Sequence, residues 1–233
     1  MLAWGTGAIA LDLPGHGDSP WRADGDYGAP ALAGQVGPAL SELRRTGLLV
    51  DRPVVVGQSL GGLTGLALVA AGAPVRHIVL VDVVPLSPSG AAEVAQLLAG
   101  PASFASRAEV VARASAFGFG GSRARLERAV RLNTRVLPDT SVVWKHHLGA
   151  LAATGRLDLG TGSTRLWDVV AHSAVPVDLV RGERGLVSAD LLDRFVALRP
   201  AAVVATLDAG HNVQEELPRE LAEVLGALVH DGS

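Results

Sequence analysis

The chain has 233 residues, of which 20 are basic and 23 are acidic, so its formal net charge is −3. This near-balance gives no electrostatic reason to expect nucleic acid or an anionic membrane as a partner. Hydrophobic residues make up 48% of the chain and charged residues 18%, a composition that excludes global disorder. Cysteine is absent, which excludes disulfides, thiol catalysis and cysteine-ligated zinc or iron–sulfur sites.

Neither a signal peptide nor a membrane span is expected. The start, MLAWGTGAIALD, has no basic segment and carries an acid at Asp12, so we predict a cytoplasmic location. Residues 54–75 are free of charge and long enough to cross a bilayer. They include Gln58, Ser59, Pro74 and five glycines, however, which favours a buried strand, turn and helix.

Short apolar runs alternate with longer helical patterns along most of the chain. The expected strands are Gly7–Asp12, Pro53–Gly57, His77–Asp82, Val175–Arg181 and Ala202–Leu207. Apolar residues at helical spacing predict helices around residues 32–43, 60–70 and 217–228. This alternation is typical of an α/β protein with a mostly parallel sheet and helices on both faces.

Residues 86–172 interrupt the alternation. They carry helical patterns at 91–99, 106–117, 122–136 and 140–154, without a strand signal. We therefore predict a core formed by residues 1–85 and 173–233, with a helical cap at 86–172. A cap would cover the carboxyl edge of the sheet, where open α/β sheets bind ligands. The alternative is that these are additional outer helices.

The strongest motif is Gly57-Gln58-Ser59-Leu60-Gly61-Gly62, which follows one expected strand and opens a helix. In G-x-S-x-G, the glycines leave room for a sharp turn that exposes the serine hydroxyl. Ser59 would then lie at the positive end of a helix, with the Leu60 N–H available to an oxyanion. The alternative is an ordinary glycine-rich turn with a solvated serine.

Nucleotide-binding motifs do not fit. The G-x-G-x-x-A segment at residues 5–10 precedes a strand instead of following one, and no G-K-[ST] occurs. We expect no cofactor and no metal.

Four ordered motifs resemble those of the α/β-hydrolase family. They are DLPGHGDS at residues 12–19, the serine motif, VDVVP at 81–85, and DAGH at 208–211. The resemblance spans essentially the whole chain from Gly7 onward. It implies that His16 is structural and that His211 is the catalytic histidine. Among the seven histidines, His211 also follows the last strand, and the order serine, acid, histidine fits.

The acid has two candidates. The family usually takes it from the loop after its seventh strand, where Glu183 is the only carboxylate. Some members take it from the end of the sixth strand, where Asp82 stands. Asp178 lies within a strand and Asp190 in a helix, so both are poorly directed. We favour Asp82 over Glu183.

The resulting prediction is a serine hydrolase that cleaves an ester, thioester or lactone of a small to medium apolar acid through an acyl-enzyme. Gln58, Phe117, Phe119 and Trp144 are expected in the substrate pocket. Carbon–carbon hydrolases and cofactor-free haloperoxidases share the fold and remain alternatives. A further alternative is a non-catalytic relative that binds a small apolar ligand.

The N-terminus departs from the family pattern. About three strands precede the DxPGHGxS turn in the family, and the loop after the third supplies a second oxyanion N–H. About six residues precede Gly7 here. We therefore expect either a truncated form of a longer protein or direct pairing of Gly7–Asp12 with Pro53–Gly57, and weak activity in both cases.

Overall fold

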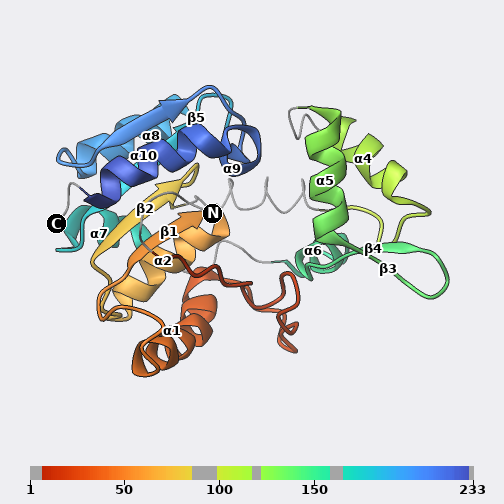
Figure 1. Cartoon of the computed structure of the whole chain (residues 1–233), viewed down its shortest axis with the longest axis horizontal. Coiled ribbons are helices and arrows are strands. Elements are labelled where there is room, and N and C mark those ends of the chain that lie inside the picture. The colour runs from red at the N-terminus through yellow and green to blue at the C-terminus, as the bar shows by residue number, and fades with distance from the viewer. Residues whose placement is uncertain (1–6, 86–98, 117–121, 158–164, 231–233) are drawn as a thin grey trace. The chain divides into compact units, whose positions relative to one another are not determined.

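The structure is a computed structural model that describes residues 7–85, 99–116, 122–157 and 165–230. The chain divides into two compact units (Figure 1). The core unit comprises Met1–Leu11, Ala29–Pro85 and Gly162–Ser233, and the second unit comprises Asp12–Gly28 and Leu86–Thr161. The expected boundaries therefore differ in two places. Residues 12–28 group with the insertion, and residues 162–172 group with the core.

The core unit contains a parallel sheet in the order β1-β2-β5-β6. These strands are β1 (Val54–Gln58), β2 (His77–Val81), β5 (Val177–Gly182) and β6 (Val204–Leu207). Their positions match four of the five strands expected from apolar runs. The mostly parallel α/β fold is thereby confirmed.

The expected strand at Gly7–Asp12 was wrong. These residues form no regular structure, and Ile9 and Leu11 are 44% and 41% exposed. Within the described sheet, β1 pairs with β2 alone, so direct pairing of this segment with β1 was wrong as well. The segment has the composition of a strand, but a strand requires a neighbouring backbone to complete its hydrogen bonds.

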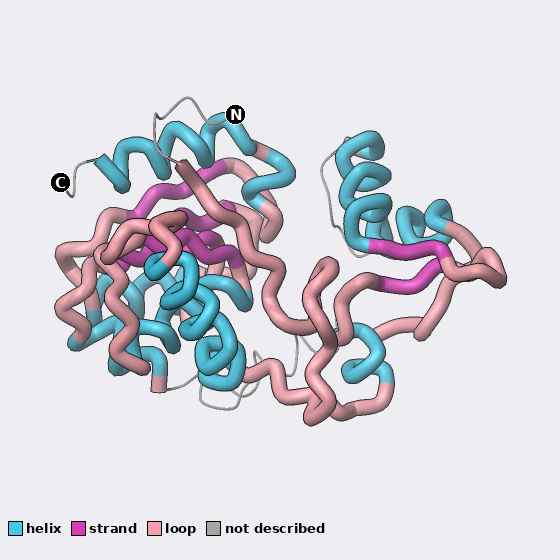
Figure 2. Tube along the Cα trace, turned by 60° about the horizontal axis from the view of Figure 1, so that its bottom comes forward, coloured by secondary structure: helices cyan, strands magenta, loops and turns pink. Residues whose placement is uncertain are grey.

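Helices cover both faces of the sheet (Figure 2). They are α1 (Ala29–Arg45), α2 (Leu60–Ala70), α7 (Leu166–His172), α8 (Ala189–Leu198), α9 (Val213–Glu216) and α10 (Pro218–His230). On one face, Val79 and Val81 pack in a cluster with Leu221 and Leu228 of α10. The opposite face of β2 meets α2, where Gly62 lies against Leu80. Successive side chains of β2 point to opposite faces of the sheet, so Val79 and Val81 pack against α10 while Leu80 packs against α2.

Helix α2 lies within the uncharged segment 54–75, which is long enough to cross a bilayer. Its residues from Gly62 to Leu68 are all buried within the core unit. Within the described ranges, no helix is both long and apolar enough to cross a membrane. A helix that is hydrophobic on all sides is expected where a protein core surrounds it.

The second unit contains α4 (Arg107–Ala116), α5 (Arg123–Asn133) and α6 (Leu148–Ala153), together with an antiparallel hairpin of β3 (Thr134–Val136) and β4 (Val142–Trp144). The all-helical expectation was therefore wrong. The helix expected to reach residue 136 ends at Asn133 because Pro138 cannot continue it and β-branched residues follow. A turn then closes the hairpin, with the Leu137 N–H donating to Ser141 O at 2.8 Å. The helix expected at 91–99 lies outside the described residues.

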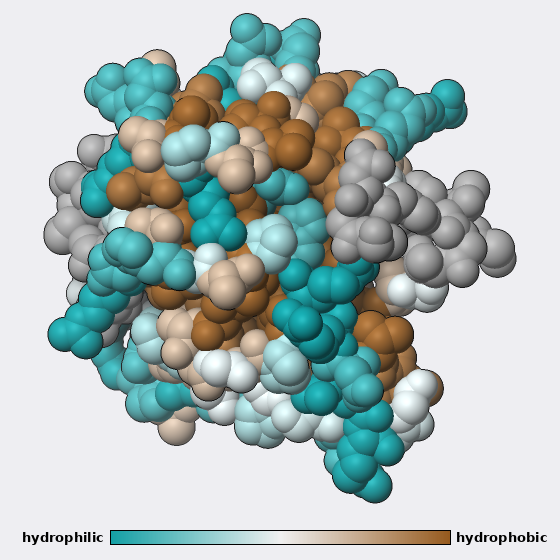
Figure 3. Space-filling model, turned by 90° about the vertical axis from the view of Figure 1, so that its left-hand side faces the viewer, coloured by the Kyte–Doolittle hydropathy of each residue, from teal (hydrophilic) through white to brown (hydrophobic). Residues whose placement is uncertain are grey.

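Large apolar side chains also reach the surface. Leu48 and Val50 are each 68% exposed, and Val56 on the edge strand β1 is 45% exposed. Figure 3 shows one face on which hydrophobic residues emerge between hydrophilic ones.

Candidate active site

Ser59 occupies the sharp turn between β1 and α2, with φ 51° and ψ −124°. A positive φ is unusual for a residue with a side chain and marks a constrained turn. A Cβ added to Gly57 would collide with the backbone of Gly61 and Gly62. A Cβ on Gly62 would lie 2.8 Å from Gly57 O. The glycines are therefore required because the strand and the helix cross without room for side chains.

The start of α2 provides an electropositive setting for Ser59. The Ser59 carbonyl accepts the N–H groups of Gly62 and Leu63 at 2.9 and 3.2 Å. The earlier N–H groups of Leu60 and Gly61 have no acceptor within an α-helix, by its geometry. Together with the helix dipole, they favour negative charge beside the serine. The Leu60 N–H is thus a candidate oxyanion donor.

Asp82 directly follows β2, and its carboxylate contacts the imidazole of His211. Asp82 Oδ2 lies 2.8 Å from His211 Nδ1. The carboxylate is fully buried and also accepts the N–H groups of Gly182 at 3.0 Å and Leu186 at 2.8 Å. Three donors hold this carboxylate in one orientation. The imidazole therefore carries its proton on Nδ1 and leaves Nε2 as an acceptor.

The alternative acid is placed differently. The Glu183 side chain is exposed, while its backbone N–H donates to Leu207 O at 2.8 Å. A Cβ on Gly185, in the same loop, would overlap the Asp82 carboxylate. The glycine thus leaves the space that Asp82 fills. The structure brings Asp82 to His211, and it leaves Glu183 at the surface.

Gln58 contacts the same histidine from the other side. Its Nε2 lies 3.0 Å from His211 Nε2 and 3.2 Å from His211 O. Both distances fit an amide NH₂ group that donates one hydrogen to His211 Nε2, which then carries no proton, and the other to His211 O. Sequence reasoning expected this side chain in the substrate pocket and missed its contact with the base, because no pattern reveals which residue faces Nε2.

The other expected pocket residues belong to the insertion. Trp144 lies edge-on to Phe104, with ring centroids 5.9 Å apart, and stacks on His146 at 5.1 Å. It packs against the hydrophobic core of the second unit. Phe117 and Phe119 lie outside the described residues.

Three of the remaining histidines, His16, His77 and His146, have contacts that stabilise the fold and lie outside the proposed triad. His77, the first residue of β2, forms a buried pair with Asp178 at 2.9 Å. It stands at the end of the strand opposite Asp82. The His16 Nδ1–H donates to Pro14 O at 3.2 Å, and burial lowers the pKa of His16. Burial also lowers the pKa of His146 to about 4.

No group of three or more metal-ligating side chains occurs in the part of the chain that the structure describes.

Comparisons with known proteins identify the family of this chain. The chain matches the Alpha/beta hydrolase family over residues 2–224. It is 34% identical to Esterase Rv0045c of Mycobacterium tuberculosis, over 98% of this chain and 76% of the esterase. The crystal structure of that esterase superimposes with a TM-score of 0.73 at 30% identity, covering 94% of this chain and 73% of the other.

A second solved structure, E-2-(acetamidomethylene)succinate hydrolase, has a TM-score of 0.76. It is 24% identical and covers 94% of this chain and 79% of that hydrolase, so it supports the fold alone. The match to the family extends over nearly the whole chain and includes the serine turn and the histidine loop. This chain therefore belongs to the α/β-hydrolase family.

Proposed function

We propose that the protein is a serine esterase in which Ser59, His211 and Asp82 form the catalytic triad. The observation that carries this proposal is the buried Asp82 carboxylate 2.8 Å from His211 Nδ1, in the same unit as the serine turn. An aspartate in this position fixes the imidazole tautomer and stabilises the cation that forms during the reaction. Serine alone is a weak nucleophile, so such a base is required.

The proposed reaction begins when Ser59 Oγ attacks the carbonyl carbon of the ester. His211 Nε2 takes the hydroxyl proton, and the Gln58 amide has to leave Nε2 for this transfer to occur. The Leu60 N–H donates to the oxyanion of the tetrahedral intermediate. The intermediate collapses as His211 returns the proton to the departing alcohol, which leaves an acyl group on Ser59.

Hydrolysis of the acyl-enzyme completes the cycle. Water attacks the acyl carbon and gives a proton to His211 Nε2, and a second tetrahedral intermediate releases the carboxylic acid. Ser59 regains its proton from His211. Every step uses residues of the core unit, and the chemistry requires no cofactor.

The proposed substrates are esters of small to medium apolar acids, with thioesters and lactones as chemically related classes. The named relative at 34% identity is an esterase, which favours oxygen esters among these. Solved structures with the same fold include an N-acyl homoserine lactonase at 21% identity, so the fold alone does not select the acyl group.

A fluorophosphonate probe tests the nucleophile directly, because only an activated serine reacts with it. We expect the wild-type chain to be labelled and Ser59→Ala to be unlabelled. The matched control is Ser41→Ala, since the Ser41 hydroxyl donates to Gly37 O within α1. Labelling of Ser59→Ala at the wild-type rate would contradict the assignment.

The substrate class needs a second measurement. A series of p-nitrophenyl esters from acetate to dodecanoate should show activity that depends on chain length and is lost in Ser59→Ala. If the wild-type chain is labelled but hydrolyses none of these esters, the nucleophile stands and the ester assignment is wrong.

A further inference from the structure

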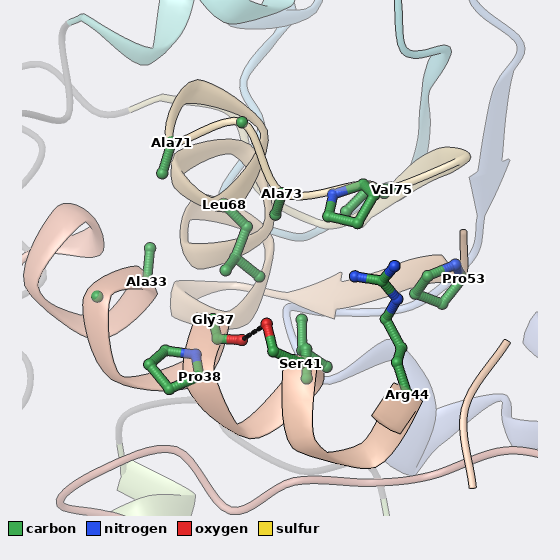
Figure 4. Close-up of a pocket in the computed structure, with 14 residues that line it drawn as sticks. Ala33, Gly37, Pro38, Ser41, Arg44, Pro53, Leu68, Ala71, Ala73 and Val75 are labelled. Atoms are coloured by element: carbon green, nitrogen blue, oxygen red, sulfur yellow. Dashed lines mark hydrogen bonds between the residues drawn. The ribbon is translucent and has the colours of Figure 1, made fainter. Parts of the chain in front are cut away.

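The core unit contains a pocket of about 350 Å³ between α1, α2 and the turn that follows α2 (Figure 4). Pro53 lines it just before β1, and Ala71–Val75 line it beyond the end of α2. Ser59, by contrast, stands after the carboxyl end of β1 and at the start of α2. The pocket therefore lies at the start of β1 and the end of α2, whereas Ser59 lies at the end of β1 and the start of α2. The proposed reaction does not use the pocket.

Most of the pocket wall is apolar. Ala33, Leu68 and Val75 are buried side chains that contribute to it from α1, α2 and the following turn. Ser41 also lines the pocket, but its hydroxyl donates to Gly37 O at 3.0 Å (Figure 4). A hydrocarbon group would find a mainly apolar surface here, and the volume lies in the range of small-molecule sites.

Arg44 is the charged exception. It lies in the last turn of α1, and Figure 4 shows its side chain extending along the pocket towards Pro53. Its Nε is buried and has no hydrogen-bond partner among the described residues. The nearest carboxylate, Asp51, is 3.9 Å from Nη2 and its side chain is 96% exposed, so it holds the guanidinium loosely. A buried donor without an acceptor is unfavourable, so a rotation of the Arg44 side chain that brings Nε to an acceptor in the pocket would relieve that cost.

We propose that this pocket binds a small aliphatic monocarboxylate. Once the Arg44 side chain turns so that Nε faces the pocket, the carboxylate of the ligand would accept from Nε and Nη2, which form one edge of the planar guanidinium. Its hydrocarbon tail would lie against Ala33, Leu68 and Val75. One cation in an apolar wall suits a single negative charge, whereas a phosphate carries more charge and more acceptor oxygens than Arg44 satisfies. This proposal is independent of the reaction at Ser59.

The test is titration calorimetry of the full chain with hexanoate, beside hexanol and hexanamide as uncharged compounds of the same length. We expect hexanoate to bind and both uncharged compounds to bind at least about tenfold more weakly, because they lose the charge-assisted contact. Arg44→Gln should weaken hexanoate binding by a similar factor. Equal affinity for hexanoate and hexanol, or no hexanoate binding at millimolar concentration, would overturn the proposal.

Two further variants identify the location of binding. Arg45→Gln is the matched control, because Arg45 neighbours Arg44, is exposed and pairs with Glu42 instead of lining the pocket. It should bind hexanoate normally. Gly37→Leu should abolish binding by filling the pocket, since a Cβ at Gly37 would lie 3.7 Å from Leu68 Cδ2, an ordinary contact with the pocket wall. Circular dichroism should confirm that each variant is folded.

Hexanoate is also a conceivable product of the proposed esterase, so binding at the triad has to be distinguished. The titration is therefore repeated after the fluorophosphonate has modified Ser59. Hexanoate binding that persists after Ser59 is modified and disappears in Arg44→Gln supports the proposal. Binding that is lost on modification of Ser59 and unchanged in Arg44→Gln refutes it, without affecting the proposed function.

Discussion

Asp82→Asn is expected to separate the role of the buried carboxylate in catalysis from its role in folding. Asp82 Oδ1 accepts the Gly182 N–H, while Oδ2 accepts both the Leu186 N–H and His211 Nδ1. An asparagine has only one side-chain oxygen. If that oxygen stays on Gly182, the NH₂ group faces Leu186 and the imidazole. His211 must then move its proton to Nε2, where it can no longer accept the serine proton.

The opposite orientation of the amide also has a cost. If the asparagine oxygen faces Leu186 and His211, the NH₂ group meets the Gly182 N–H, and a buried donor is left without an acceptor. Such a donor costs about 1–3 kcal/mol of the free energy of unfolding. The first orientation leaves the Leu186 N–H without its acceptor as well, but Leu186 is 41% exposed, so water can replace that acceptor. The Gly182 N–H is buried, so its larger penalty favours the orientation that disrupts the histidine.

The expected loss of turnover is larger than the loss of stability. By analogy with serine-protease triads, where the wrong tautomer lowers turnover about 10⁴-fold, we expect Asp82→Asn to lose about 10³–10⁴-fold. That factor corresponds to about 4–5.5 kcal/mol of transition-state stabilisation. Turnover is measured with a p-nitrophenyl ester and stability by urea unfolding, so that the two losses are obtained independently.

Glu183→Gln is the control, because its side chain is exposed and should change turnover by less than about threefold. Equal and mild effects of the two substitutions would refute Asp82 as the acid and favour a serine–histidine dyad. Turnover of Asp82→Asn could also fall only in proportion to the fraction of the variant that is unfolded. That result would refute this reasoning, because the folded variant would then be fully active.

Three other predictions follow from the same geometry. Gly185→Ala should lower turnover at least about tenfold, because its Cβ overlaps the Asp82 carboxylate; wild-type turnover would show that the loop simply shifts. Ser59→Ala/His211→Ala should be little slower than either single variant, as in triads that act as a unit; a much slower double variant would show independent contributions. Burial, and secondly His16, lower the pKa of His146 from 6.5 to about 4, so acid favours the unfolded chain, which binds the proton more readily. The free energy of unfolding should therefore fall by up to about 3 kcal/mol as the pH drops from 6.5 to 4, and urea titrations should show that His146→Gln flattens this dependence.

The parts of the fold that could be predicted from the sequence are those with a strong local signal. Strand β2 is an apolar run after His77, as expected for a strand buried on both faces. Strand β5 is buried along most of its length although it contains Asp178 and Arg181, and the positions of both strands were predicted closely. The turn at Ser59 was predictable because its glycines are required by local contacts between the strand and the helix. In each case, the residues that determine the local structure lie within a few positions of one another in the sequence.

The errors occurred where a distant partner decides the structure. Gly7–Asp12 has the composition of a strand, but no described strand pairs with it. The hairpin of β3 and β4 consists of three-residue strands, which are too short to show an alternating pattern. The buried pair of His77 with Asp178 joins residues 101 positions apart, and it becomes visible only once β2 and β5 are neighbours.

The choice of acid shows that two weak signals can be read together. A loop without an aspartate after β5 is ambiguous by itself, and so is an aspartate after β2. In the structure the two features depend on each other, because the Asp82 carboxylate occupies the space that a Cβ on Gly185 would need, and it accepts the N–H of the next residue, Leu186. A side chain at position 185 would exclude the carboxylate, and without the carboxylate the Leu186 N–H would lack its acceptor within the protein. The glycine in this loop and the acid at the end of β2 therefore belong together, and the arrangement of the neighbouring strands β2 and β5 is what reveals it.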